Sequence, residues 1–295
     1  MRVLILGVTG TLGHALWHVF REHHALDTWG TLRSEKGLSY FSEAAWDHLI
    51  HDVDVLDQDT LLSIFEKVRP DVVINAIGII KQLAASHDPL AVLPINAMLP
   101  HRLARMCALA NARLLLMSTD CVFSGKKGDY VESDRSDAED LYGQSKAIGE
   151  VADLPHVLTM RSSIIGHELN SHYSLVDWFL AQTHSVKGYV NAIYSGFPTV
   201  EFAKIVRDYI VPNKGLSGVY HMASKPISKF DLLQLIAERY NKKIRIEPDE
   251  AICIDRSLCA KRFNDQTGFV PAEWPILIDR MYESRTLIGN RFHAD

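Results

Sequence analysis

The stretch Arg2-Val-Leu-Ile-Leu-Gly-Val-Thr-Gly-Thr-Leu-Gly13 decides the fold of this 295-residue chain. Its first five residues form the short apolar, partly β-branched run that a strand buried on both faces requires. Glycines follow at positions 7, 10 and 13, and the amphipathic residues 14–23 predict a helix. A strand, a glycine-rich turn and a helix make the first half of a dinucleotide-binding βαβ unit. The alternative is a tight turn between strand and helix that holds no ligand.

Each glycine of this turn has a separate physical role. Gly7 permits the tight turn, Gly10 lets the backbone approach a pyrophosphate, and Gly13 lets the helix sit close to the sheet. Free N–H groups and a partial positive charge at the start of the helix attract phosphates. The predicted cofactor loop is completed by Thr9, Thr11 and Leu12.

Composition and charge exclude several other classes of protein. Hydrophobic residues make up 47% of the chain and charged residues 23%, which is typical of a packed protein and not of a disordered one. The net charge of -5 argues against a nucleic-acid binder, and no apolar run reaches the ~18–20 residues that span a bilayer. The N-terminus leads directly into a strand without a signal-peptide pattern, so we expect a cytoplasmic protein. Neither the four cysteines nor the His14/His18 pair has the spacing of a complete metal site, so no metal is predicted, and whether a divalent metal assists is left open.

Further strands alternate with helices through the first half of the chain. We expect strands at 28–32, 52–56, 72–78 and 114–117, which predict an α/β fold with a doubly wound parallel sheet, Rossmann-like, with a smaller C-terminal lobe. Ligands bind outside the carboxyl ends of such strands. Arg33 follows the second strand, where a guanidinium accommodates the 2′-phosphate of NADP, so NADP is preferred and NAD is the alternative. Another strand ends in Ala76, Ile77 and Gly78, where the small residues let the chain pass close to a cofactor.

The sequence Tyr142-Gly-Gln-Ser-Lys146 carries the predicted chemistry. In a helix, Tyr142 and Lys146 lie one turn apart on the same face. A nearby ammonium favours the phenolate and lowers the pKa of a tyrosine, which is ordinarily ~10. The tyrosine can then exchange a proton with a carbonyl or alcohol oxygen near neutral pH. Thr119, at the end of a strand, supplies a hydroxyl that can hydrogen-bond the same oxygen.

Taken together, these motifs resemble the extended short-chain dehydrogenase/reductases, and most closely the dTDP-4-dehydrorhamnose reductase-like sugar-nucleotide reductases. The resemblance covers nearly the whole chain and is sharpest before residue 166. It rests on the segments 7–13, 75–78, 118–125, 130–132, 142–146, 149–150 and 198–199.

The resemblance implies a role for each matching residue. Thr119, Tyr142 and Lys146 form the expected catalytic triad. The expected cofactor residues beyond the glycine-rich loop and Arg33 are Asp54 and Val55 at the adenine, Ala76, Ile77 and Gly78, and Ser118, Tyr142 and Lys146.

Departures from the family pattern lie near the expected sugar and base sites. The family commonly has tyrosine at Cys121 and aspartate at Ser124, and residues 75–82 replace the usual loop. The expected substrate residues are Lys81, Gln82, Asp120, Cys121 and Arg256. Of these, Arg256 is chosen because a nucleotide sugar carries a diphosphate; a surface cation is the alternative.

The predicted activity is NADP-dependent reduction of the C4 ketone of a nucleotide-activated 4-keto-6-deoxysugar, for surface polysaccharide sugar biosynthesis. One alternative is a sugar-nucleotide epimerase or dehydratase, although the second acid expected after Asp120 is replaced by Cys121. The other is a non-catalytic NADP-binding regulatory subunit. We expect a nucleotide-sugar substrate, with no nucleic acid or membrane partner, and a homodimer is left open. Residues 1–165, with 193–220 returning, are expected to bind the dinucleotide, and residues 166–192 and 221–295 to form the substrate lobe.

Overall fold

The chain divides into two compact units in this computed structural model, which describes residues 1–169 and 172–288. The first unit contains residues 1–118, 140–160 and 203–219, and the second contains 119–139, 161–202 and the chain from 220 onward. This division differs from the expected one because the segments 119–139, 161–165 and 193–202 belong to the second unit. Tyr130 forms an isolated parallel bridge with Leu258, and its amide donates to the carbonyl of Ser257 at 2.9 Å. Residues 170–171 and 289–295 of the expected lobe lie outside the described residues.

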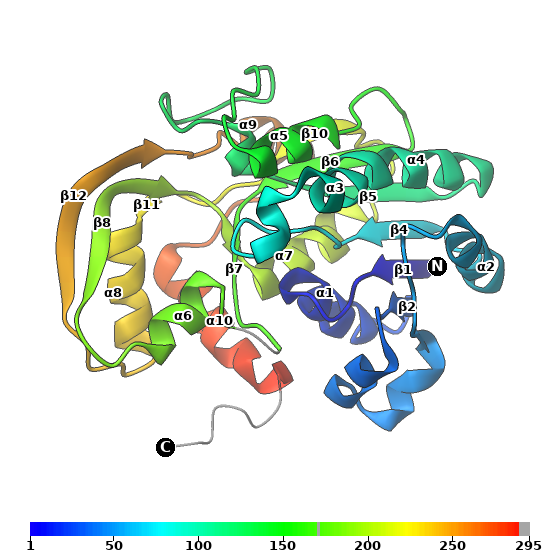
Figure 1. Ribbon diagram of the computed structural model, residues 1–295, viewed down its shortest axis with the longest axis horizontal. Coiled ribbons are helices and arrows are strands. Elements are labelled where there is room, and N and C mark those ends of the chain that lie inside the picture. Colours follow the sequence, from blue (N-terminus) through cyan, green and yellow to red (C-terminus); the bar gives the residue numbers. More distant parts are fainter. Residues whose placement is uncertain (170–171, 289–295) are drawn as a thin grey trace. The chain divides into compact units, whose positions relative to one another are not determined.

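A seven-stranded sheet with the order β10-β6-β5-β4-β1-β2-β3 organises the first unit (Figure 1). Neighbouring strands from β5 through β4, β1 and β2 to β3 pair in parallel. The strands are β1 Arg2–Leu6, β2 Asp27–Thr31, β3 Leu49–Ile50, β4 Val72–Asn75, β5 Arg113–Thr119, β6 Val157–Ser162 and β10 Gly218–His221.

Helices cover both faces of this sheet. They are α1 Thr11–Arg21, α2 Gln58–Val68, α3 Pro89–Val92, α4 Leu99–Leu109 and α5 Leu141–Ile148, with the π-helical segments η4 Leu93–Met98 and η6 Val206–Ile210 and the 3-10 segments η1 Glu35–Tyr40, η2 Glu43–His48 and η3 Ala84–His87. Leu4 and Leu6 of β1 share a buried core with α2 and α4. Successive strand residues point to opposite faces, so Val3 and Ile5 face the layer that contains α1. Figure 1 shows α1 and α4 on opposite sides of β1 and β4, which confirms the predicted doubly wound arrangement.

The prediction of a strand at 52–56 is wrong. The third strand is β3, which contains only Leu49 and Ile50, and it follows η1 and η2. Asp52 has a φ of 57°, which an extended strand cannot contain. Val53 and Val55 alternate with polar residues as in a strand. Their side chains are buried, but the backbone that carries them forms a turn.

The second unit is built on a three-stranded sheet with the order β11-β8-β12. Helix α8 packs on β8 and also contacts α10. The elements are η5 Asp120–Val122, β7 Ile164–Ile165, α6 Leu175–Ala181, β8 Val186–Tyr194, β9 Phe197–Pro198, β11 Ile227–Ser228, α8 Lys229–Arg239, β12 Ile246–Asp255, α9 Lys261–Thr267, α10 Trp274–Ser284 and η7 Arg285–Ile288, while α7 Thr199–Ile205 leads into η6. Among the described residues, no helix has the length and apolar character that crossing a membrane requires.

Candidate active site

The glycine-rich loop adopts the turn that its sequence predicts. Gly7 has a φ of 85°, which favours glycine, and its carbonyl oxygen accepts the N–H of Gly10 at 3.1 Å. A Cβ added to Gly13 would lie 2.0 Å from that same oxygen, so α1 can sit this close only with glycine there. Thr31 at the end of β2 accepts the Gly7 N–H with its hydroxyl at 3.1 Å.

The start of α1 is open to an anion. Gly10 caps the helix without a side-chain hydrogen bond, so the first N–H groups, including those of Thr11 and Leu12, have no partner within the helix. A Cβ at Gly10 would meet no atom closer than 3.5 Å, which leaves room beside the backbone. Arg33 is exposed just beyond β2. These features fit the diphosphate and the 2′-phosphate of NADP.

The chain after β4 lies directly beside the glycine-rich loop. A Cβ added to Gly7 would lie 2.6 Å from Cγ1 of Ile77, and the Ile77 N–H donates to Asn75 Oδ1 at 3.1 Å. Buried Asn96, from η4, accepts the Ile79 N–H at 2.9 Å and donates to the Ile79 carbonyl at 2.9 Å. Ala76 and Ile77 therefore border the loop, while the nearest atom to a Cβ added to Gly78 is Oδ1 of Asn96 at 3.5 Å. The role of these residues at the cofactor stays a prediction.

The expected adenine residues lie in the turn after β3. Asp54 is exposed, and one of its carboxylate oxygens accepts the N–H of Leu56 at 2.9 Å, while Val55 is buried. Their role at the adenine stays a prediction.

Helix α5 brings Tyr142 and Lys146 to one face. Asp140 caps the helix by accepting the Gly143 N–H at 2.8 Å. The ammonium of Lys146 donates to the carbonyl oxygen of Met117, near the end of β5, at 2.6 Å. Burial lowers the pKa of Lys146 to about 8, and the Glu150 carboxylate opposes this shift. The ammonium is thus held at the carboxyl edge of the sheet.

Two of the expected substrate residues follow β4 in the first unit. Lys81 forms an ion pair with Asp140 at 2.6 Å, so its charge is already matched by the carboxylate that caps α5. Gln82 is exposed. Neither side chain has a geometry that decides its role.

In the second unit, Thr119 and Asp120 form a compact polar pair. The Thr119 hydroxyl donates to Asp120 at 3.1 Å and accepts the Cys121 N–H at 3.1 Å. Burial raises the pKa of Asp120, although the Arg256 guanidinium and hydrogen bonds from Cys121, Thr119 and Ser163 favour its ionised form. To donate to a substrate oxygen, the Thr119 hydroxyl must rotate away from Asp120.

Arg256 is fixed beside this pair. Its Nε donates to the Phe123 carbonyl at 2.8 Å, and Nη1 lies 3.8 Å from the Sγ of Cys121. The structure thus brings together three of the expected substrate residues, Asp120, Cys121 and Arg256, within one unit.

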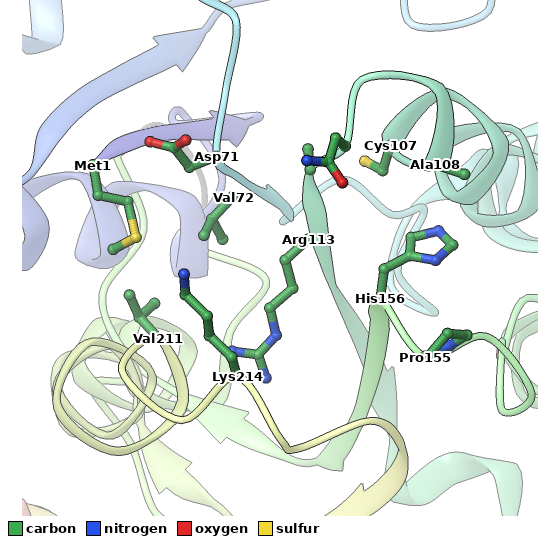
Figure 2. Close-up of a pocket in the computed structure, with 12 residues that line it drawn as sticks. Met1, Asp71, Val72, Cys107, Ala108, Arg113, Pro155, His156, Val211 and Lys214 are labelled. Carbon is green, nitrogen blue, oxygen red and sulfur yellow. The ribbon is translucent and has the colours of Figure 1, made fainter.

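A cavity of about 690 Å³ lies at the other edge of the sheet (Figure 2). It is lined by residues at the amino ends of the strands, including Val72, Arg113 and His156. The Arg113 guanidinium donates to the carbonyls of Ile210 and Leu216 at 2.7 and 2.9 Å. It therefore binds the last residue of η6 and the loop that follows it. Because open α/β sheets bind ligands at the carboxyl ends of their strands, this cavity is not the expected cofactor site.

Comparison with known proteins decides the family. The family model described as RmlD substrate binding domain matches residues 1–262. The chain belongs to this family. The predicted membership and fold are thereby confirmed.

Two curated relatives of this chain carry different descriptions. A dTDP-4-dehydrorhamnose reductase of Aggregatibacter actinomycetemcomitans is 28% identical over 240 residues, which cover 78% of this chain and 76% of the relative. The methionine adenosyltransferase 2 subunit beta of Mus musculus is 23% identical over 310 residues, covering 95% and 90%. The first is named as an enzyme and the second as a subunit.

Solved structures share the fold over nearly the full chain. The dTDP-4-dehydrorhamnose reductase of Bacillus anthracis, in complex with NADP, superposes with a TM-score of 0.76 at 19% identity, covering 96% of this chain and 99% of that one. WbmG of Bordetella bronchiseptica, in complex with NAD and UDP, gives 0.79 at 16% identity, covering 98% and 96%. The predicted enzyme class, an NAD(P)-dependent sugar-nucleotide oxidoreductase, is the class of the named reductases.

Proposed function

We propose that this member of the RmlD family reduces the C4 ketone of a nucleotide-activated 4-keto-6-deoxysugar with NADPH. The observation that carries the proposal is the position of Lys146, one helical turn from Tyr142, with its ammonium fixed to the end of β5 at the edge where the glycine-rich loop opens. The reductase relative supports the substrate class, and the exposed Arg33 supports NADP over NAD.

Each residue of the proposed triad has a defined task. The dihydronicotinamide, when bound, supplies the hydride to the carbonyl carbon. Tyr142 donates its phenolic proton to the oxygen, on which negative charge develops. The Lys146 ammonium stabilises the phenolate that remains, and Thr119 donates a hydrogen bond to the same oxygen. In the second unit, Arg256 is proposed to bind the diphosphate of the substrate.

The test is oxidation of NADPH with a panel of dTDP-, UDP- and GDP-linked 4-ketosugars. We expect stoichiometric NADPH consumption with at least one of them. Tyr142→Phe should abolish turnover and leave NADPH binding intact, because only the proton donor is lost. A Phe variant that retains wild-type turnover would refute the role of Tyr142.

The same assay separates the alternatives. An epimerase or dehydratase regenerates its cofactor, so it converts sugar without net NADPH consumption. The similarity to methionine adenosyltransferase 2 subunit beta supports the alternative that the chain is a regulatory subunit. This alternative predicts NADPH binding without reduction of any ketosugar, and a partner enzyme that co-purifies with the chain.

A further inference from the structure

Two side chains from one segment hold the end of β5. Lys146 on α5 donates to the Met117 carbonyl at 2.6 Å, and the Ser118 hydroxyl donates to the carboxylate of Glu150 at 2.6 Å. Lys146 and Glu150 are four residues apart in the sequence, and the residues that they bind, Met117 and Ser118, are consecutive. The carboxylate therefore lies beside the strand end that the ammonium also contacts.

Several other titratable groups belong to the elements that pack against α5, the helix that carries Lys146. His87 lies in η3, and Asp88 precedes α3. His101 of α4 contacts the Ile148 carbonyl at 2.7 Å. The Lys81–Asp140 ion pair lies at the first turn of α5. The Glu150 carboxylate opposes the lowering of the Lys146 pKa that burial causes.

We infer that Glu150 is a positioning residue that keeps the Lys146 ammonium charged and directed at the end of β5, and thereby sets the upper pH limit of the reaction. The inference rests on the proposed function for its kinetic consequence. Glu150 itself acts through Lys146 and Ser118, and no contact with a substrate is assigned to it.

The sign of the effect follows from electrostatics. The pKa of Lys146 already lies at about 8 because burial disfavours its charge. Removing a neighbouring negative charge makes a proton easier to lose, so the pKa of Lys146 falls further. A neutral Lys146 no longer stabilises the phenolate of Tyr142. Without the Glu150 charge, the loss of activity at alkaline pH should therefore begin at a lower pH than in the wild type.

Glu150→Gln is the deciding variant because it removes the charge and retains an oxygen that can accept from Ser118. We expect the alkaline limb of the kcat/KM profile to move down by about 1 pH unit. Asp153→Asn is the matched control: Asp153 is exposed and forms no hydrogen bond or ion pair with the described residues. It should leave the limb in place. Glu150→Asp, which restores the charge, should move the limb back toward the wild-type position.

A second readout does not depend on turnover. NMR titration of protein labelled with ¹³C-lysine, with the Lys146 signal identified by its loss in Lys146→Met, reports the lysine pKa directly. We expect a downward shift in Glu150→Gln, measured at temperatures where unfolding curves show all variants folded. Equal Lys146 titrations in wild type and Glu150→Gln would overturn the inference. If the wild-type chain reduced no ketosugar, the proposed function would fail, while the titration would still decide the role of Glu150.

Discussion

At the scale of single residues, we expect the preference for NADP to depend on Arg33. It is exposed next to the carboxyl end of β2, the end at which Thr31 holds the glycine-rich loop. An acidic residue beside the ribose favours NAD, but Asp27, the acidic residue of β2, begins this strand at its other end and contacts His48 at 3.2 Å. Of these two residues, Arg33 is the one near the carboxyl end of β2, so we propose it for the adenosine ribose.

Replacing Arg33 by alanine should weaken NADPH binding selectively. A charge-assisted hydrogen bond to phosphate contributes ~2 kcal/mol, so we expect the Kd for NADPH to rise roughly 30-fold. NADH lacks the 2′-phosphate, and its Kd should change little. Fluorescence titration with both dinucleotides measures the two constants, and an equal loss for NADH would contradict a phosphate-specific role.

Two residues that stabilise the site, Thr31 and Asn96, were not found from the sequence. Thr31 binds Gly7 across 24 positions, and Asn96 approaches Ser145 across 49. Ser118 was expected as a cofactor residue, but its hydrogen bond to Glu150, across 32 positions, was not predicted. Local motifs indicated only the groups that we expect to touch cofactor and substrate. Contacts between distant segments depend on strand order, which a motif does not specify.

At the scale of elements, the strand–loop–helix unit at the N-terminus was predictable because its constraints are local. The glycine at position 13 is required by the distance between α1 and the loop, and the sequence spacing already indicated it. The prediction of a strand at 52–56 was wrong because the alternation of its valines indicates burial and not backbone conformation. Both valines are buried, but the backbone at Asp52 has a positive φ and forms a turn.

A substitution at Gly13 tests this packing. In Gly13→Ala the added Cβ would meet the backbone oxygen of Gly7, which has no flexible end to move aside. We expect a loss of unfolding free energy of about 1–3 kcal/mol, and weaker NADPH binding because the loop must shift. Gly215→Ala is the control, since its Cβ would approach no atom closer than 3.5 Å. Urea unfolding compares the two, and equal stability would contradict the close approach.

At the scale of the whole molecule, the strand order reverses between β1 and β4. Strands β2 and β3 extend from β1 on one side, and β5 and β6 from β4 on the other. The crevice for a ligand in such a sheet lies at the carboxyl ends of the two strands where the order changes. Gly7 follows β1 and Ala76 follows β4, so the first unit carries the dinucleotide features by itself. The polar group of Asp120, Cys121 and Arg256 belongs to the second unit.

This separation predicts that the two ligands protect different parts of the chain from hydrogen exchange. NADPH should slow exchange in residues 7–13 and 75–79 of the first unit, because a ligand stabilises the segments that it contacts. A nucleotide-linked 4-ketosugar, added to the NADPH complex of Tyr142→Phe to prevent turnover, should additionally slow exchange in residues 119–125 and 255–258. Mass spectrometry of peptides resolves these segments. Protection by NADPH without any further protection by the sugars would contradict the reductase proposal and favour the regulatory-subunit alternative, since such a subunit needs the dinucleotide site but no site for a ketosugar.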